Sequence, residues 1–277
     1  MTHILLQDQP IGVFDSGMGG LTVMRALIER LPHESFVYLG DTARLPYGSK
    51  SADTVTRYAV QCARALMHHR IKLMVVACNT ASATALPALA EVLKPLPVLG
   101  VIEPGAEAAV KAAPSGRIAV IATEGTVNGR AYERAIRARN PAAVVTQQAC
   151  PLFVALAEEG LTDGPIVELA AKRYLDPVFA GAPPDCLVLG CTHFPVLKVT
   201  IARVVGSSVK LVDSADTTAI ATERLLSERG LSRTGGARTL RFLATDAPER
   251  FARVGEIFLG AKIAPADVEL VDLDARQ

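Results

Sequence analysis

Short, mostly apolar runs recur along the chain with longer helix-like stretches between them, and this alternation most limits the possible folds. The segments 51–70, 126–140 and 216–229 carry apolar residues at helical spacing between charged ones. Nine runs lie at 11–15, 36–40, 73–77, 97–101, 118–122, 143–147, 186–190, 209–213 and 239–245, the last alternating more than the others. Continuous apolar runs with β-branched residues are typical of strands buried on both faces. Strands alternating with helices predict an α/β fold, with mainly parallel sheets flanked by helices.

The chain also contains a weak internal repeat. LMVVACNT at 73–80 resembles CLVLGCTH at 186–193, because each is a buried strand that ends at a cysteine followed by polar residues. IGVFDSGMGG at 11–20 compares in the same way with IAVIATEGTV at 118–127. Repeats of this kind indicate two similar halves. We expect the chain to cross between them near 100–105 and 212–215.

Composition excludes several classes of protein. The formal net charge of the 277 residues is +1, and half of the residues are hydrophobic. A compact globular protein is expected, with no long-range attraction to nucleic acid or to an acidic membrane. The five cysteines form no C-x-x-C pair, so we predict no disulfide framework and a reducing compartment. The first residues lack the features of a signal peptide, which favours a cytoplasmic protein.

Two cysteines carry the most chemical information. Cys78 and Cys191 each follow a buried strand and precede a predicted helix, where backbone N–H groups are expected to lower a thiol pKa below its free value of about 8.5. Either cysteine alone is more often a small buried hydrophobe. Together they suggest a two-base reaction, in which one thiolate removes a proton and the opposite thiol delivers one. Cys62, Cys150 and Cys186 lack such polar turns and are interpreted as structural.

Polar residues beside these turns are candidates for assisting the thiols. Asp15 ends the first strand, and His193 lies two residues after Cys191. A histidine there favours thiolate formation or moves a proton. The alternative for Asp15 is a turn or capping residue, and the alternative for His193 is a structural histidine.

The same loops have the composition of an anion site. We expect Ser16 and Gly17 to open the first helix, and Thr80 and Thr192 follow the two cysteines. Hydroxyls and backbone N–H groups at helix N-termini bind carboxylates. The loop at 41–50 adds Tyr47 and Gly48, although an ordinary surface turn is an equally simple interpretation.

Several sequence blocks resemble the glutamate racemases of the aspartate/glutamate racemase superfamily, and the resemblance covers nearly the whole chain. The most specific blocks are VVACNTASA and LVLGCTHFPVL, which contain both cysteines. The others are GVFDSGMGGL (12–21), YLGDTARLPYGSK (38–50), VIEPGA (101–106), ATEGTV (122–127), VDSA (212–215) and ATDAPERF (244–251).

The resemblance implies a specific activity. Members of this family interconvert L- and D-glutamate without pyridoxal phosphate or metal, supplying D-glutamate for peptidoglycan. Carried onto this sequence, Cys78 is the base towards D-glutamate and Cys191 the base towards L-glutamate, with Asp15 and His193 assisting. Glu158 matches a segment with a functionally important acidic residue, and the choice between Glu158 and Glu159 stays open. The implied substrate-binding residues are Asp15, Ser16, Tyr47, Gly48, Asn79, Thr80, Thr123, Thr126, Thr192 and His193.

The family fold implies two α/β domains with the active site between them. The second domain is inserted into the first, so residues 1–100 and 213–277 form the Cys78 side and residues 101–212 form the Cys191 side. These boundaries agree with the crossings expected from the repeat. A homodimer is possible, since the oligomeric state varies in the family.

Four other interpretations remain. An aspartate or hydantoin racemase keeps both cysteines, and an assay with aspartate distinguishes it. A pyridoxal-phosphate enzyme needs a Schiff-base lysine, for which Lys50 is the only candidate within a motif. A thiol-sensing or binding module needs no turnover. A zinc site from Cys186, Cys191 and His193 is disfavoured because successive strand side chains point to opposite faces.

Overall fold

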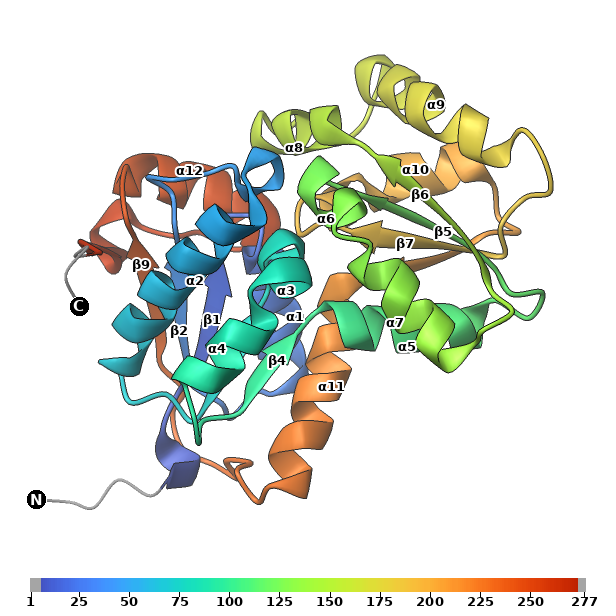
Figure 1. Cartoon of the computed structure of the whole chain (residues 1–277). Coiled ribbons are helices and arrows are strands. Elements are labelled where there is room, and N and C mark those ends of the chain that lie inside the picture. Colours follow the sequence, from blue (N-terminus) through green and yellow to red (C-terminus); the bar gives the residue numbers. More distant parts are fainter. Residues whose placement is uncertain (1–5, 274–277) are drawn as a thin grey trace, which may run out of the picture.

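The computed structural model describes residues 6–273, and its strands form two separate parallel sheets (Figure 1). The first has the order β10-β9-β2-β1-β3-β4 and the second the order β6-β5-β7-β8. The first sheet contains β1 (Ile11–Asp15), β2 (Phe36–Gly40), β3 (Leu73–Val76), β4 (Val98–Gly100), β9 (Leu240–Ala244) and β10 (Val268–Leu270). The second contains β5 (Arg117–Ala122), β6 (Val144–Ala149), β7 (Cys186–Gly190) and β8 (Lys210–Asp213). The predicted α/β fold with parallel sheets is confirmed.

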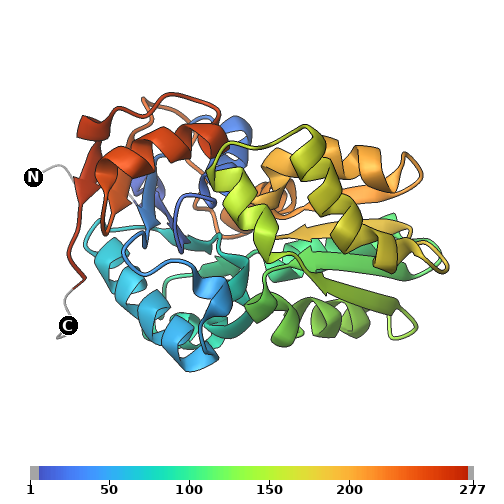
Figure 2. The ribbon, with the colours of Figure 1, turned by 90° about the horizontal axis from the view of Figure 1, so that it is seen from above.

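Helices flank both sheets, and the two halves lie side by side (Figures 1 and 2). The helices are α1 (Leu21–Arg30), α2 (Ala52–Met67), α3 (Asn79–Thr84), α4 (Leu86–Val92), α5 (Ile102–Ala112), α6 (Glu124–Asn128), α7 (Ala131–Arg139), α8 (Pro151–Glu158), α9 (Pro165–Phe179), α10 (Lys198–Val205), α11 (Ser214–Glu228) and α12 (Pro248–Leu259). Four 3-10 turns complete the structure: η1 (Leu6–Asp8), η2 (Tyr47–Ser49), η3 (Phe194–Leu197) and η4 (Pro265–Asp267). No helix among residues 6–273 is long and apolar enough to cross a membrane.

The inner strands of the first sheet contribute to two apolar cores, one on each face. Val13 of β1 packs in a core shared with α1 and α12, whereas its neighbour Phe14 packs against residues of α2 and α3. Because successive side chains point to opposite faces, a strand covered on both sides must be apolar throughout. This explains why the strands appear in the sequence as continuous runs. All nine predicted runs form strands, whereas β10 is a three-residue edge strand that gave no recognisable signal.

The first four strands of each half are arranged in the same order. In each half the first strand lies between the second and the third, and the fourth lies beyond the third. The strand order therefore reverses between β1 and β3, and again between β5 and β7. Ligands of open parallel sheets bind at such reversal points, beyond the carboxyl ends of the strands. Cys78 follows β3 and Cys191 follows β7 at these two points.

The chain leaves the first sheet after β4 and returns to it after β8. One passage leads from β4 into α5, and the other leads from β8 into α11. The two helices pack against each other, and α11 also packs along α1 of the first half (Figure 1). Asp213 caps α11 by accepting a hydrogen bond from the Asp216 backbone N–H at 3.0 Å. Local capping thus starts the helix that returns the chain to the first sheet.

Candidate active site

Cys78 lies at the first turn of α3, as the sequence predicts. Its Sγ accepts a hydrogen bond from the Ala81 backbone N–H at 3.4 Å and lies 3.5 Å from Ser16 Oγ. The expected lowering of its pKa is nevertheless wrong. Burial and the nearby Asp15 carboxyl raise the pKa of Cys78 to about 12. Only 5% of Cys78 is exposed, so removing water from the sulfur outweighs the few donors that reach it.

Cys191 lies in a different environment at the end of β7. His193 Nδ1 is 3.7 Å from Cys191 Sγ, and His193 Nε2 is 3.1 Å from Glu158 Oε1. Burial by itself lowers the pKa of His193, but the hydrogen bonds to Cys191 and Glu158 outweigh it and raise the pKa to about 10. The imidazole is therefore protonated at neutral pH, with both ring nitrogens as donors. A donor facing Cys191 Sγ stabilises negative charge on that sulfur.

The carboxylate behind His193 is Glu158, at the C-terminal end of α8. Burial opposes its ionisation, but His193 and Arg250 together hold the pKa of Glu158 below its usual value. Arg250 Nη2 donates to Glu158 Oε2 at 2.9 Å. Glu159 is exposed and is not part of this chain of contacts. Geometry therefore places Glu158, rather than its neighbour, beside the histidine.

Asp15 connects the two halves at the centre of the site. Its Oδ2 accepts from the Gly17 backbone N–H at 3.0 Å, and its Oδ1 accepts from Thr192 Oγ1 at 3.4 Å. Burial raises the pKa of Asp15. Ser16 and Gly17 do not open the first helix, because α1 begins only at Leu21. They form a turn that carries the backbone across the end of β1.

A glycine lets this turn approach the Cys191 loop. A Cβ at Gly19 would lie 2.4 Å from His193 Nδ1 and 2.6 Å from Thr192 Oγ1, so no other residue fits without displacing the histidine. Thr22 Oγ1, one turn further on, donates to the Thr192 carbonyl at 2.9 Å. These contacts hold the Cys191 loop against the start of α1.

Three threonines link the Cys78 loop to the second half. Thr80 Oγ1 lies 2.9 Å from Thr123 Oγ1 and 3.2 Å from Thr126 Oγ1, and the last two are 3.1 Å apart. Thr80 comes from α3, while Thr123 follows the end of β5, the equivalent of β1. The loop of Gly48 also reaches this cluster, since a Cβ there would lie 2.7 Å from Thr123 Cβ.

Asn79 is held by two residues that the sequence did not single out. Its Oδ1 accepts from the Tyr132 hydroxyl at 2.8 Å, and its Nδ2 donates to Ser214 Oγ at 3.4 Å. Tyr132 lies at a position of α7 that is typical of a core residue, and it belongs to none of the motifs. Ser214 lies in the VDSA block, which gave a weak signal. Tyr47 is buried with its hydroxyl donating to Asp41, so that hydroxyl is already engaged.

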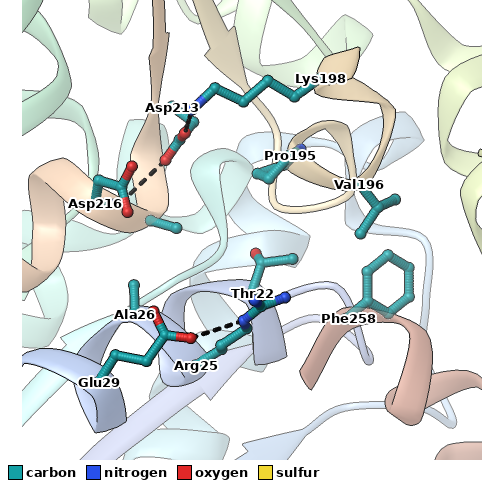
Figure 3. Close-up of a pocket in the computed structure, with 11 residues that line it drawn as sticks. Thr22, Arg25, Ala26, Glu29, Pro195, Val196, Lys198, Asp213, Asp216 and Phe258 are labelled. Atoms are coloured by element: carbon teal, nitrogen blue, oxygen red, sulfur yellow. Dashed lines mark hydrogen bonds and ion pairs between the residues drawn. The ribbon is translucent and has the colours of Figure 1, made fainter. Parts of the chain in front are cut away.

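A cavity of about 280 Å³ lies behind the Cys191 loop (Figure 3). Its walls include Thr22 of α1, Val196 of η3 and Phe258 of α12, and it is bordered by the Lys198–Asp213 ion pair. Neither Cys78 nor Cys191 lines it. Both cysteines are buried.

The arrangement as a whole brings two thiols, each with its own ionisable neighbour, to one edge between the sheets. Cys78 adjoins Ser16 and is influenced by the Asp15 carboxyl, whereas Cys191 faces a protonated His193. Hydroxyls and amides surround them. Such a site is equipped to hold a small polar acid and to move a proton to or from it on two sides.

Comparison with known proteins agrees with this geometry. Residues 11–222 match the family model described as Asp/Glu/Hydantoin racemase. A glutamate racemase of Geobacter metallireducens is 51% identical over 96% of this chain and 98% of that protein. One of Neisseria meningitidis serogroup A is 47% identical, again over 96% and 98%.

Solved structures give the same result. Glutamate racemase from Francisella tularensis, solved in complex with D-glutamate, superimposes with a TM-score of 0.90 at 40% identity, covering 97% of this chain and 99% of that one. The isoform RacE1 from Bacillus anthracis gives a TM-score of 0.91 at 38% identity, covering 96% and 98%. The chain therefore belongs to the Asp/Glu/hydantoin racemase family, and within that family it is similar to the glutamate racemases over nearly its whole length.

Proposed function

We propose that this protein interconverts L- and D-glutamate by passing the α-proton between Cys78 and Cys191. The observation that carries the proposal is the placement of two buried thiols after the third strand of two similarly ordered sheets. Inversion at a carbon atom needs one group on each side of it, and two similar halves facing each other supply that arrangement. The names of the similar proteins support glutamate as the substrate.

The proposed reaction uses the difference between the thiols. From L-glutamate, a Cys191 thiolate stabilised by His193 removes the α-proton, and the electron pair of the C–H bond stays on the substrate as a carbanion. The Cys78 thiol then donates its proton to the opposite face and becomes a thiolate. From D-glutamate the two thiols exchange roles. Each turnover therefore leaves one thiol and one thiolate, so protons and charge balance without an added cofactor.

The remaining polar groups are assigned to substrate binding within this proposal. Asp15 assists Cys78, and His193 with Glu158 assists Cys191. The groups that hold the carboxylates and ammonium of glutamate are drawn from Asp15, Ser16, Tyr47, Gly48, Asn79, Thr80, Thr123, Thr126, Thr192 and His193. Because the hydroxyl of Tyr47 is bonded to Asp41, Tyr47 contributes through its ring or by shaping the loop.

We also propose the division of the chain that follows from this reaction. Residues 1–100 and 213–277 form the domain of Cys78, and residues 101–212 form the inserted domain of Cys191. The support is that the first sheet is built from both ends of the chain and the second from its middle. The proposed physiological role is supply of D-glutamate for peptidoglycan in the cytoplasm, with a homodimer as a possible assembly.

The test is circular dichroism of L- and D-glutamate incubated with the protein in deuterated water. Wild type should abolish the optical activity and incorporate α-deuterium. Cys78→Ser and Cys191→Ser should each slow racemisation by about a hundredfold to ten-thousandfold, because a serine hydroxyl is far less acidic than a thiol and therefore hardly ionises and donates a proton poorly. Cys186→Ser is the matched control, since Cys186 is equally buried at the start of β7. Racemisation of aspartate without glutamate, or inertness of the folded wild type, would refute the proposal.

A further inference from the structure

Arg250 of α12 reaches the Cys191 side of the site from the opposite half of the molecule. We propose that Arg250 is a positioning residue, which holds Glu158 and through it His193 in the orientation that Cys191 needs. This inference rests on the proposed racemase function. It assigns a role to a residue outside both cysteine motifs.

The contacts form an unbroken series. Arg250 Nη2 donates to Glu158 Oε2 at 2.9 Å, and Glu158 Oε1 lies 3.1 Å from His193 Nε2. His193 Nδ1 in turn lies 3.7 Å from Cys191 Sγ. The two oxygens of Glu158 thus have separate partners, one on each side. A carboxylate bound at both oxygens has its plane fixed, and the histidine ring follows that plane.

Burial explains why Glu158 needs a second partner. Only 14% of its side chain is exposed, against 40% for that of Arg250. A carboxylate so poorly hydrated is expensive to keep ionised with one donor, and Arg250 adds a second charge-assisted bond. Arg250 donates its hydrogen bond to Glu158, and Glu158 is the residue that contacts His193, so the proposed effect of Arg250 passes through Glu158.

A second side chain of the same helix supports the histidine. The ring of Phe258 meets the His193 ring edge to face, with centroids 5.0 Å apart. Phe258 lies beside Val196 of the Cys191 loop (Figure 3). Arg250 and Phe258 are eight residues apart, which places them about 80° apart around the axis and on one broad side of α12. One helix face thus contacts the histidine on its ring and fixes the carboxylate bonded to it.

This arrangement predicts a directional effect, because its contacts lead through His193 to Cys191 rather than to Cys78. Enantiomers have equal free energy, so kcat/KM must stay equal for L- and D-glutamate in every variant. The step that limits the rate is free to change. Loosening the Cys191 side makes proton removal from L-glutamate slower, and it makes proton delivery to the intermediate formed from D-glutamate slower by the same factor.

The experiment compares Arg250→Ala, Arg250→Lys and the control Arg253→Ala, which removes an exposed arginine of the same helix. We expect kcat/KM of Arg250→Ala to fall about tenfold or more. The α-deuterium isotope effect on kcat/KM should rise with labelled L-glutamate and fall with labelled D-glutamate. Arg250→Lys should recover much of the rate and the wild-type isotope effects, because a lysine ammonium keeps the charge near Glu158.

The outcomes separate this inference from the proposed function. If wild type does not racemise glutamate, the function fails. If wild type is active but Arg250→Ala keeps its rate, or loses rate with both isotope effects unchanged, Arg250 is at most structural and the inference is overturned. Equal losses in Arg253→Ala would also overturn it. Thermal unfolding of each variant identifies any loss that comes from destabilisation.

Discussion

Cys78 and Cys191 occupy equivalent places in two similarly ordered sheets, yet their surroundings have opposite charge. The Asp15 carboxyl and burial favour the protonated form of Cys78, whereas a protonated His193 faces Cys191 Sγ. The backbone repeat therefore gives two similar positions, and the neighbouring side chains make them different. In the proposed two-base reaction, Cys78 must carry a proton before L-glutamate binds, and its surroundings favour that protonated form.

The largest expected effect comes from removing the charge beside Cys191. His193→Gln should lower kcat by about a hundredfold or more, because it removes the protonated group that the proposal assigns to stabilising negative charge on Cys191. Alkylation of the free protein with iodoacetamide, followed by mass spectrometry of each cysteine peptide, tests the cause. In wild type at pH 7, Cys191 should react faster than Cys78, and in the variant this difference should disappear. Equal reactivity in native wild type would contradict the comparison.

A smaller effect is expected one step further from Cys191. Glu158→Gln keeps the shape but loses the charge that holds the pKa of His193 high, so kcat should fall about tenfold or more. The matched variant Glu159→Gln should leave kcat within about twofold, since Glu159 is exposed. A steady-state assay in both directions measures each. Equal losses in the two variants would show that the assignment of Glu158 is mistaken.

The smallest expected effect concerns the Cys78 side and its pH dependence. With a pKa of about 12, Cys78 is mostly thiol throughout the neutral range, so its alkylation rate should rise about tenfold per pH unit between pH 7 and 9. Asp15→Asn removes a negative charge that raises this pKa. The alkylation rate of Cys78 at pH 8 should therefore increase several-fold, while turnover falls because the assisting group is gone. A slower alkylation of Cys78 in Asp15→Asn would contradict the assigned electrostatics.

The apolar runs predicted nearly all of the fold because their residues satisfy two cores at once. Val13 and Phe14 illustrate this, since adjacent residues of one strand are buried on opposite faces. Edge strand β10 escaped prediction because Glu269 and Leu270 are exposed and leave no periodic pattern. The residue types of Ser16 and Gly17 predict the start of a helix, whereas the backbone forms a turn there and α1 begins only at Leu21.

Within the candidate site, the motif residues are recognisable in the sequence, whereas the residues that hydrogen-bond to them are not. Asp15 ends a strand, and both cysteines and His193 lie within three residues of a strand end, a position that is visible in the sequence. Tyr132 and Arg250 lie within amphipathic helices, where nothing in the spacing distinguishes them from core or surface residues. Their partners, Asn79 and Glu158, are 53 and 92 residues away. Such pairs become apparent only when the helices are packed.

The alternation of strands and helices, the repeat and the placement of two thiols after strands could all be predicted from the sequence alone. These features depend on local residue patterns, which a single chain displays directly. The pKa shifts of Cys78 and His193 became apparent only in the folded protein, because they depend on burial and on charges brought from distant segments. At Cys78, desolvation raises the thiol pKa by more than the helix N-terminus lowers it. At Cys191, a protonated histidine lies beside the sulfur and is held by Glu158 of α8, which Arg250 of α12 contacts. Electrostatic interactions depend on distances in the folded protein, and the sequence shows only which residues are neighbours along the chain.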